Sequence, residues 1–128
     1  MPVTLRDLEE AIRSAWSPET AFASAEYLAR APEKPSRGQC GTTALVVRDL
    51  LGGELLVAQV AVGGVVDGVH YWNRLGGRLE VDLTHDQFRA DEVVLPPQVV
   101  SRPGLPRPER ARVAYLLLRS RVLLALAQ

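Results

Sequence analysis

The chain has 128 residues, of which nearly half are hydrophobic, and its 15 basic and 15 acidic residues leave no net charge. This length allows one domain with a hydrophobic core and is too short for two, so we expect a single domain over residues 1–128. A neutral chain lacks the basic surplus that binds nucleic acids or anionic membranes, which argues against both as partners.

The sequence also indicates a cytoplasmic protein. It begins without the basic and then apolar pattern of a signal peptide, and no apolar run approaches the roughly 20 residues of a membrane span. Its single cysteine, Cys40, cannot form an internal disulfide, which fits a reducing compartment and leaves a free thiol.

Helices are predicted on both sides of a short loop in the first third of the chain. Thr4 with Asp7 forms a capping box, and apolar residues at helical spacing follow as far as Trp16. Ser17 and Pro18 are typical of a second helix start, which we expect to continue through residues 22–28. Two prolines then predict a loop over residues 31–36.

The middle of the chain predicts a helix followed by a sheet. A helix is expected from Cys40 to the Gly52-Gly53 stop, and then three antiparallel strands over residues 55–62, 69–75 and 79–83, the first of them central. Asp67-Gly68 is expected to close the first turn. A last helix over residues 109–127 is predicted to pack through the stripe Val113, Leu116, Leu117, Leu123 and Leu124. This order of elements is typical of the α+β class.

Cys40, His70 and Asp82 are the candidate catalytic residues. The unpaired N–H groups and the dipole of a helix start favour a thiolate, so Cys40 is placed as a nucleophile. His70 lies on one predicted strand and can act as its base, and Asp82 on the next strand can orient the imidazole. The arrangement requires the start of the Cys40 helix to reach over the face of the sheet that carries His70.

The turn between the last two strands decides whether His70 and Asp82 share a face of the sheet. An odd-length loop centred on Gly76 pairs His70 with Asp82, whereas a two-residue Gly76-Gly77 turn sends Asp82 to the opposite face. The apolar pattern favours the odd loop, because it gathers the alternate apolar residues from Val69 to Leu83 on the other face.

Other residues near these three have weaker assignments. The Gln39 amide could bind an oxyanion beside the backbone N–H of Cys40, and Trp72 could form a wall of a substrate cleft. His85 is a rival base that we expect to be exposed. A metal site formed by Cys40, His70, Asp82 and His85 is a further alternative, although paired zinc-ligand spacings are absent.

Three segments carry a family resemblance. Residues 38–53, which begin Gly38-Gln39-Cys40-Gly41, residues 70–75 and residues 80–88 resemble the YunG-like family of small bacterial proteins. The resemblance covers the middle of the chain and implies no particular substrate.

The order of cysteine helix, histidine strand and aspartate strand also resembles papain-like and transglutaminase-like cysteine enzymes, including the NlpC/P60 peptidases. This resemblance implies a papain-like core with Cys40 as nucleophile, His70 as base and Asp82 as orienting acid. The expected function is therefore a cysteine hydrolase or acyltransferase that needs no cofactor and acts on an amide or thioester of a small-molecule or peptide-like substrate. A non-catalytic binding domain that keeps the cleft is the main alternative, and a homodimer is left open.

Overall fold

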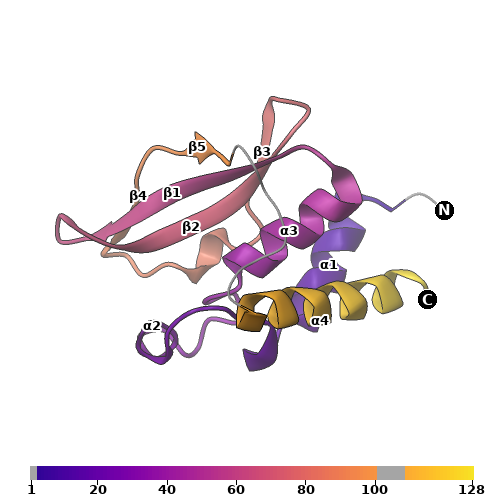
Figure 1. Ribbon diagram of the computed structural model, residues 1–128, viewed down its shortest axis with the longest axis horizontal. Helices are drawn as coiled ribbons and strands as arrows, with labels where there is room; N and C mark the ends of the chain where they lie inside the picture. The colour runs from indigo at the N-terminus through magenta and orange to yellow at the C-terminus, as the bar shows by residue number, and fades with distance from the viewer. Residues whose placement is uncertain (1–2, 101–108) are drawn as a thin grey trace.

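The computed structural model describes residues 3–100 and 109–128, in which helices pack against one curled, five-stranded antiparallel sheet (Figure 1). The helices are α1 (Leu5–Ala15), α2 (Ala25–Ala29), α3 (Cys40–Leu51) and α4 (Glu109–Leu126), with 3₁₀ turns η1 (Pro18–Thr20) and η2 (His85–Gln87). The strands are β1 (Glu54–Val62), β2 (Val65–Leu75), β3 (Leu79–Val81), β4 (Glu92–Val94) and β5 (Gln98–Val99). The predicted α+β class is confirmed.

The sheet has the order β3-β2-β1-β4, and β5 also pairs with β1, so the prediction that the first strand is central is confirmed. The predicted turn at Asp67-Gly68 is wrong, because both residues lie inside β2. Gly63 and Gly64, which both have positive φ, form the whole turn between β1 and β2. The pairing of these two strands therefore begins with Val62 opposite Val65.

The N-terminal prediction is correct for the first helix and only partly correct for the second, which is interrupted between η1 and α2. α1 begins with the predicted capping box of Thr4 and Asp7. After Pro18, however, only the short turn η1 forms. The Phe22 N–H donates to the Gly38 carbonyl at 3.0 Å, which holds the chain extended until α2 begins. The segment before Cys40 is thereby attached to the segment after α1.

α3 crosses one face of the sheet, and α1 and α4 pack on the side of α3 that faces away from the sheet (Figure 1). The main core lies between these helices. The Asn73 side chain on β2 donates to the Ala44 carbonyl on α3 at 2.9 Å and fixes the helix to this face. The predicted packing stripe of α4 is wrong, because most of its apolar residues are exposed. The inward residues of α4 are Ala111, Ala114, Tyr115, Leu118 and Val122.

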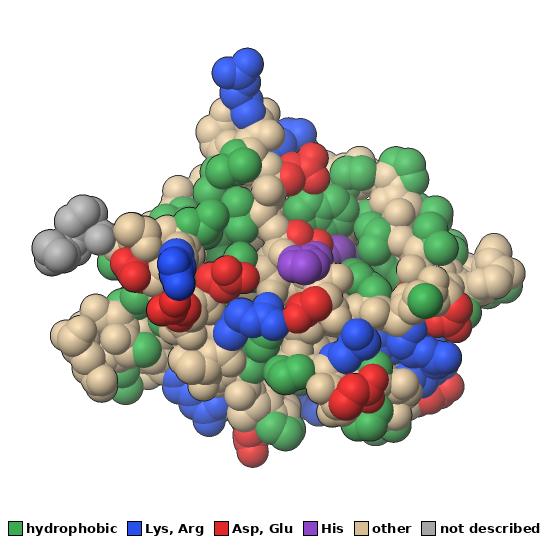
Figure 2. Space-filling model, turned by 180° about the vertical axis from the view of Figure 1, so that it is seen from behind, with side chains coloured by type: hydrophobic (Ala, Val, Ile, Leu, Met, Phe, Trp, Pro, Cys, Tyr) green, Lys and Arg blue, Asp and Glu red, His purple; other side chains and the backbone are tan. Residues whose placement is uncertain are grey.

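The opposite face of the sheet carries a smaller core. Leu56, Ala58 and Trp72 pack together there, next to the buried His70, whose ring meets the Phe88 ring edge-on at 4.7 Å. The segment after β3 thus covers a face whose polar residues look solvent-facing in the sequence. Acidic and basic side chains are interspersed on the surface seen in Figure 2. None of the helices in the described residues is long and apolar enough to cross a membrane.

Candidate functional site

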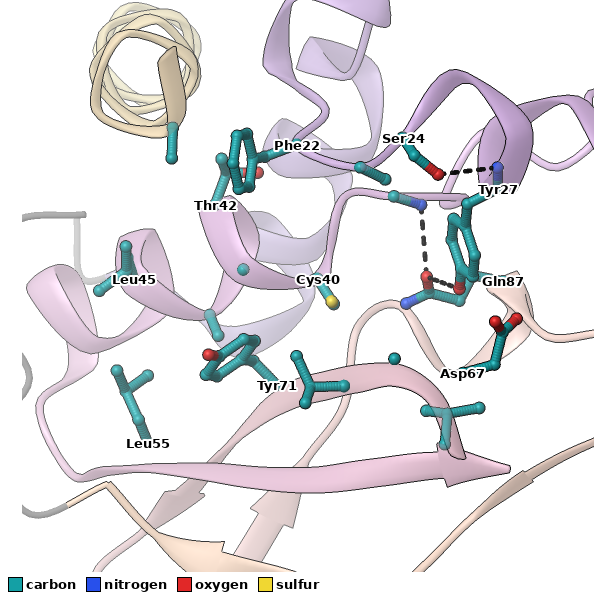
Figure 3. A pocket seen from close by; sticks show the side chains of 18 of the residues that line it. Phe22, Ser24, Tyr27, Cys40, Thr42, Leu45, Leu55, Asp67, Tyr71 and Gln87 are labelled. Carbon is teal, nitrogen blue, oxygen red and sulfur yellow. Dashed lines mark hydrogen bonds between the residues drawn. The ribbon is translucent and has the colours of Figure 1, made fainter. Parts of the chain in front are cut away.

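Cys40 is the first residue of α3, as the sequence predicted. The residue two positions earlier, Gly38, has φ +77°, and a Cβ there would lie 2.6 Å from Leu28 Cδ2. A glycine is therefore required for the sharp, crowded entry into the helix. The half-buried Cys40 lines a cavity of about 510 Å³ between α3, the 22–27 segment and the sheet (Figure 3).

His70 and Asp82 are in direct contact, with His70 Nε2 2.6 Å from Asp82 Oδ2. The loop between β2 and β3 has three residues, because Leu75 pairs with Leu79. The predicted odd length is confirmed, whereas the predicted centre at Gly76 is wrong, since the register centres on Gly77. Asp82 is consequently a diagonal neighbour of His70 rather than its direct partner, and both still share a face.

Asp82 and Cys40 both act on the pKa of the buried His70 side chain. Burial lowers the pKa of His70, but the hydrogen bond that His70 donates to Asp82 and the hydrogen bond and charge of Cys40 outweigh it and raise the pKa to about 9. Asp82 contacts Nε2, and the other ring nitrogen, Nδ1, faces the Gln87 side chain at 3.4 Å.

Cys40 reaches His70 by a different route from the predicted one. α3 packs on the opposite face of the sheet, where a Cβ on Gly41 would lie 3.9 Å from the Tyr71 ring. β3 pairs only with residues 73–75 of β2. The earlier part of that edge, which includes His70, is therefore not covered by β3.

Gln87 is a site residue that the sequence analysis did not identify. Its buried amide Nε2 donates to Thr84 Oγ1 at 3.0 Å and lies 3.4 Å from His70 Nδ1. Its Oε1 accepts from Tyr27 Oη at 3.0 Å and from Gly38 N at 3.3 Å. This one side chain joins the histidine to the backbone that precedes Cys40. The only signal in the sequence is its position three residues after Thr84, which does not reveal a buried amide.

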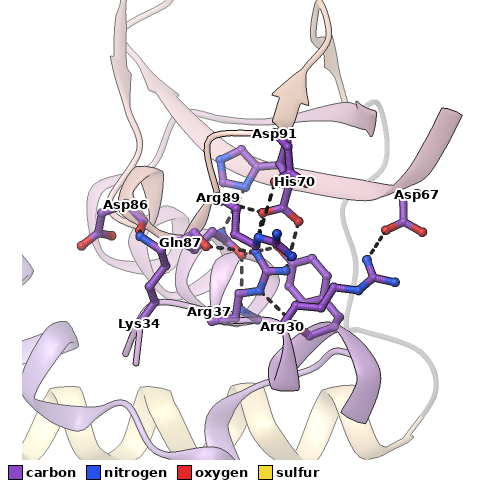
Figure 4. Close-up of polar contacts among 12 residues, drawn as sticks. Arg30, Lys34, Arg37, Asp67, His70, Asp86, Gln87, Arg89 and Asp91 are labelled. Carbon is purple, nitrogen blue, oxygen red and sulfur yellow. Dashed lines mark hydrogen bonds and ion pairs between the residues drawn. The ribbon is translucent and has the colours of Figure 1, made fainter. Parts of the chain in front are cut away.

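Arg37 and Glu92 form a buried ion pair beside Gln87 (Figure 4), and each side chain is only 2% exposed. Arg37 binds both carboxylate oxygens of Glu92, at 2.5 and 3.0 Å, and donates to the carbonyls of Tyr27 and Gln87. Burial raises the pKa of Glu92, but the Arg37 hydrogen bonds dominate and hold that pKa below its usual range. Loss of one partner from such a pair costs about 3–5 kcal/mol, so Arg37 firmly anchors the loop before Cys40.

Gln39 and Trp72 do not line the cavity, in contrast to the roles predicted for them. Both ends of the Gln39 amide are bound to the η1 region, by the Ser17 carbonyl at 2.9 Å and the Thr20 hydroxyl at 2.8 Å. Trp72 lies on the far face of the sheet, where it stacks on His70 with ring centroids 5.1 Å apart. Gln39 therefore holds a turn, and Trp72 supports the imidazole from behind.

His85 is exposed, as expected. Within the described part of the chain no group of three or more His, Cys, Asp or Glu side chains is arranged to hold a metal ion, so the four-ligand alternative has no geometric support. The arrangement that remains is a buried imidazole in contact with a carboxylate, beside a thiol that lines a cavity, and these are groups that nucleophilic chemistry can use.

Comparison with known proteins identifies the family. The family model described as "YunG protein" matches residues 4–127. The chain belongs to the YunG family. This YunG-family chain is also 40% identical over 58 residues to "Uncharacterized protein YunG" of Bacillus subtilis (strain 168), an alignment that covers 45% of each chain. No solved structure matches the chain. The family resemblance expected from the sequence is confirmed.

Proposed function

We propose that this chain is a cysteine-dependent hydrolase or acyltransferase that acts on the amide or thioester of a small substrate. Cys40 is the nucleophile, His70 exchanges protons through Nδ1, and Asp82 orients and charges the imidazole through Nε2. The proposal also treats α3 and the β2–β3 hairpin as a reduced papain-like core, since the order of cysteine helix, histidine strand and aspartate strand is the same.

One observation carries the proposal: the buried His70 contacts Asp82 at 2.6 Å and interacts with Cys40, whose side chain lines a cavity. The 2.6 Å contact with Asp82 and the raised pKa of His70 are the features expected of an imidazolium that stabilises a thiolate. A purely structural histidine needs hydrogen-bond partners but no free thiol beside a cavity of about 510 Å³.

The geometry suggests how the acyl transfer runs. The thiolate attacks the carbonyl carbon of the substrate. The negative charge that develops on the carbonyl oxygen is stabilised by the N–H groups of Cys40 and Gly41, which a helix start leaves without intrahelical partners. His70 then donates its Nδ1 proton to the leaving amine or thiol. Water, or a second amine, attacks the acyl-enzyme after His70 removes its proton, and the acyl–sulfur bond breaks to restore the thiolate.

Steady-state turnover of a panel of small thioesters and amides tests the proposal. We expect product release by the wild-type chain and background rates for Cys40→Ala and His70→Ala, with Gln59→Leu, at an exposed position of β1, as a control that keeps the wild-type rate. Turnover that survives in Cys40→Ala would overturn the proposal. So would a wild-type chain that turns over no member of the panel and leaves Cys40 unmodified. The second outcome would favour the non-catalytic binding domain.

A further inference from the structure

The cavity at Cys40 has two chemically different halves, which Figure 3 shows on opposite sides of the sulfur. On one side lie the apolar side chains of Leu45 and Leu55. Ala44, Val100 and Ala111 also line the cavity. On the other side lie polar groups, which include Gln87 and Asp67.

The apolar half follows one face of α3. Ala44 and Leu45 lie one turn beyond Cys40 and Gly41, so the helix presents an apolar wall that extends roughly 6 Å along its axis beyond Cys40. Tyr71 and Leu55 of the sheet line the same cavity. Such a trough suits a straight apolar chain attached to the reacting carbonyl.

The position of His70 determines which half holds which part of the substrate. His70 does not itself line the cavity, but its Nδ1 lies 3.4 Å from the amide of Gln87, which lines the polar half. The group that leaves Cys40 must receive its proton from Nδ1, so the leaving group has to sit in this half. The acyl group is then directed to the apolar half.

The charges around the cavity support the same orientation. The charged lining residues in the described part of the chain are two carboxylates, Asp67 and Glu92, and both are paired, at 2.6 Å with Arg30 and 2.5 Å with Arg37. An anionic acyl group would find no cationic lining partner there and would lose its hydration without compensation. Asp67 is partly exposed and is compatible with a neutral or amine-bearing leaving group.

From these features we propose that the preferred substrates are thioesters of medium-length, straight-chain apolar acyl groups. This inference rests on the proposed function and specifies its substrate class. Cys40 sulfur bonds to the acyl carbon while the carbon–sulfur bond of the thioester breaks, and the leaving sulfur takes the Nδ1 proton. Water then releases the carboxylic acid and restores Cys40, so that one thioester and one water give one acid and one thiol.

A chain-length series tests this substrate class. The full chain is incubated with the N-acetylcysteamine thioesters of acetyl, butanoyl, hexanoyl, octanoyl and succinyl groups, and acyl-Cys40 and released thiol are followed over time. We expect kcat/KM to rise about threefold for each added methylene until the apolar half is full. Succinyl, which has the length of butanoyl, should react at least tenfold more slowly than butanoyl because its carboxylate is desolvated.

Leu45→Trp narrows the apolar half and gives a second, independent readout. We expect it to lower the octanoyl-to-acetyl rate ratio at least tenfold, whereas the matched control Leu124→Trp, on an exposed position of α4, keeps the wild-type ratio. Circular dichroism and a thermal melt establish that both variants fold. The chain-length series with the wild-type chain tests the substrate class even if neither variant folds.

The outcomes separate this inference from the proposed function. Acyl-Cys40 that forms at rates independent of chain length, or fastest with succinyl, would overturn the apolar substrate class and leave the cysteine chemistry intact. Failure to acylate Cys40 with any member of the series would overturn both.

Discussion

His70 Nε2 and Asp82 Oδ2 lie 2.6 Å apart although the two residues are not opposite each other in the β2–β3 pairing. β3 ends at Val81, so Asp82 is free of the strand pairing and turns toward the histidine. Its second oxygen accepts the Thr84 N–H at 3.2 Å, which fixes the carboxylate. The short strand therefore sets the orientation of the imidazole.

Asp82→Asn keeps a hydrogen-bonding group beside His70 and removes its charge. Because the hydrogen bond and the charge of Asp82 both raise the pKa of His70, we expect this pKa to fall from about 9 toward its ordinary value. An NMR titration of the histidine ring protons measures the change, with the exposed His85 as an internal reference in the same spectrum. An unchanged titration of His70 in the variant would show that Asp82 does not control it.

The raised pKa of His70 predicts how stability depends on pH. The pKa is higher in the folded chain, about 9, than the ordinary 6.5, so protonation of His70 stabilises the fold. This contribution is fully present below about pH 6.5 and is lost as the pH rises through about 9. We expect the free energy of unfolding to fall by about 2–3 kcal/mol over this range in urea titrations. His70→Gln should show a much smaller fall, and a wild-type stability that is level or rises over the same range would contradict the prediction.

Gln87→Leu removes the amide that joins His70 to the loop before Cys40. The Gly38 N–H and the Tyr27 hydroxyl would lose their shared acceptor in a buried region, at a cost of about 2–3 kcal/mol in the free energy of unfolding. Urea denaturation measures this loss, and Gln59→Leu, at an exposed position of β1, serves as the matched control. Equal effects of the two substitutions would mean that the buried amide has no special role.

Gly38 and Gly41 flank Cys40, and they should respond in opposite ways to alanine. Gly38→Ala forces a positive φ on alanine and drives its Cβ to 2.6 Å from Leu28 Cδ2, so we expect a loss of at least about 1 kcal/mol. Gly41→Ala lies in the helix and meets only ordinary contact at 3.9 Å from the Tyr71 ring, so it should be neutral or stabilise by up to about 1 kcal/mol. Thermal melts of the two variants decide the matter, and a tolerated Gly38→Ala would contradict the crowded helix entry.

The elements that the sequence predicted well are those with strong local signals. The capping box at Thr4, the stop at Gly52 and the alternation around the β2–β3 loop were all sufficient to define their elements. The second helix was only partly predicted because a tertiary contact, Phe22 N–H to the Gly38 carbonyl, overrides the local signal of Ser17 and Pro18.

The site was only partly predictable for a similar reason. The residue types and spacing were enough to predict that His70 and Asp82 share a face of the sheet and that Cys40 begins a helix. The role of Gln87, the binding of the Gln39 amide to the η1 turn and the placement of Trp72 behind His70 depend on contacts between distant segments. A local pattern carries no information about such contacts. The packing side of α4 was mispredicted because apolar residues surround that helix, so periodicity could not choose between its faces.

The most direct measurement of the central claim is the mass of the intact chain during a single turnover. The wild-type chain is mixed with hexanoyl thioester, quenched in acid at successive times and compared with Cys40→Ala and His70→Ala. We predict that a hexanoyl adduct on Cys40 appears with the first thiol released and then decays, that it is absent in Cys40→Ala, and that it forms at least a hundredfold more slowly in His70→Ala. Thiol release without an adduct on Cys40, or an adduct that forms equally fast in His70→Ala, would contradict the account.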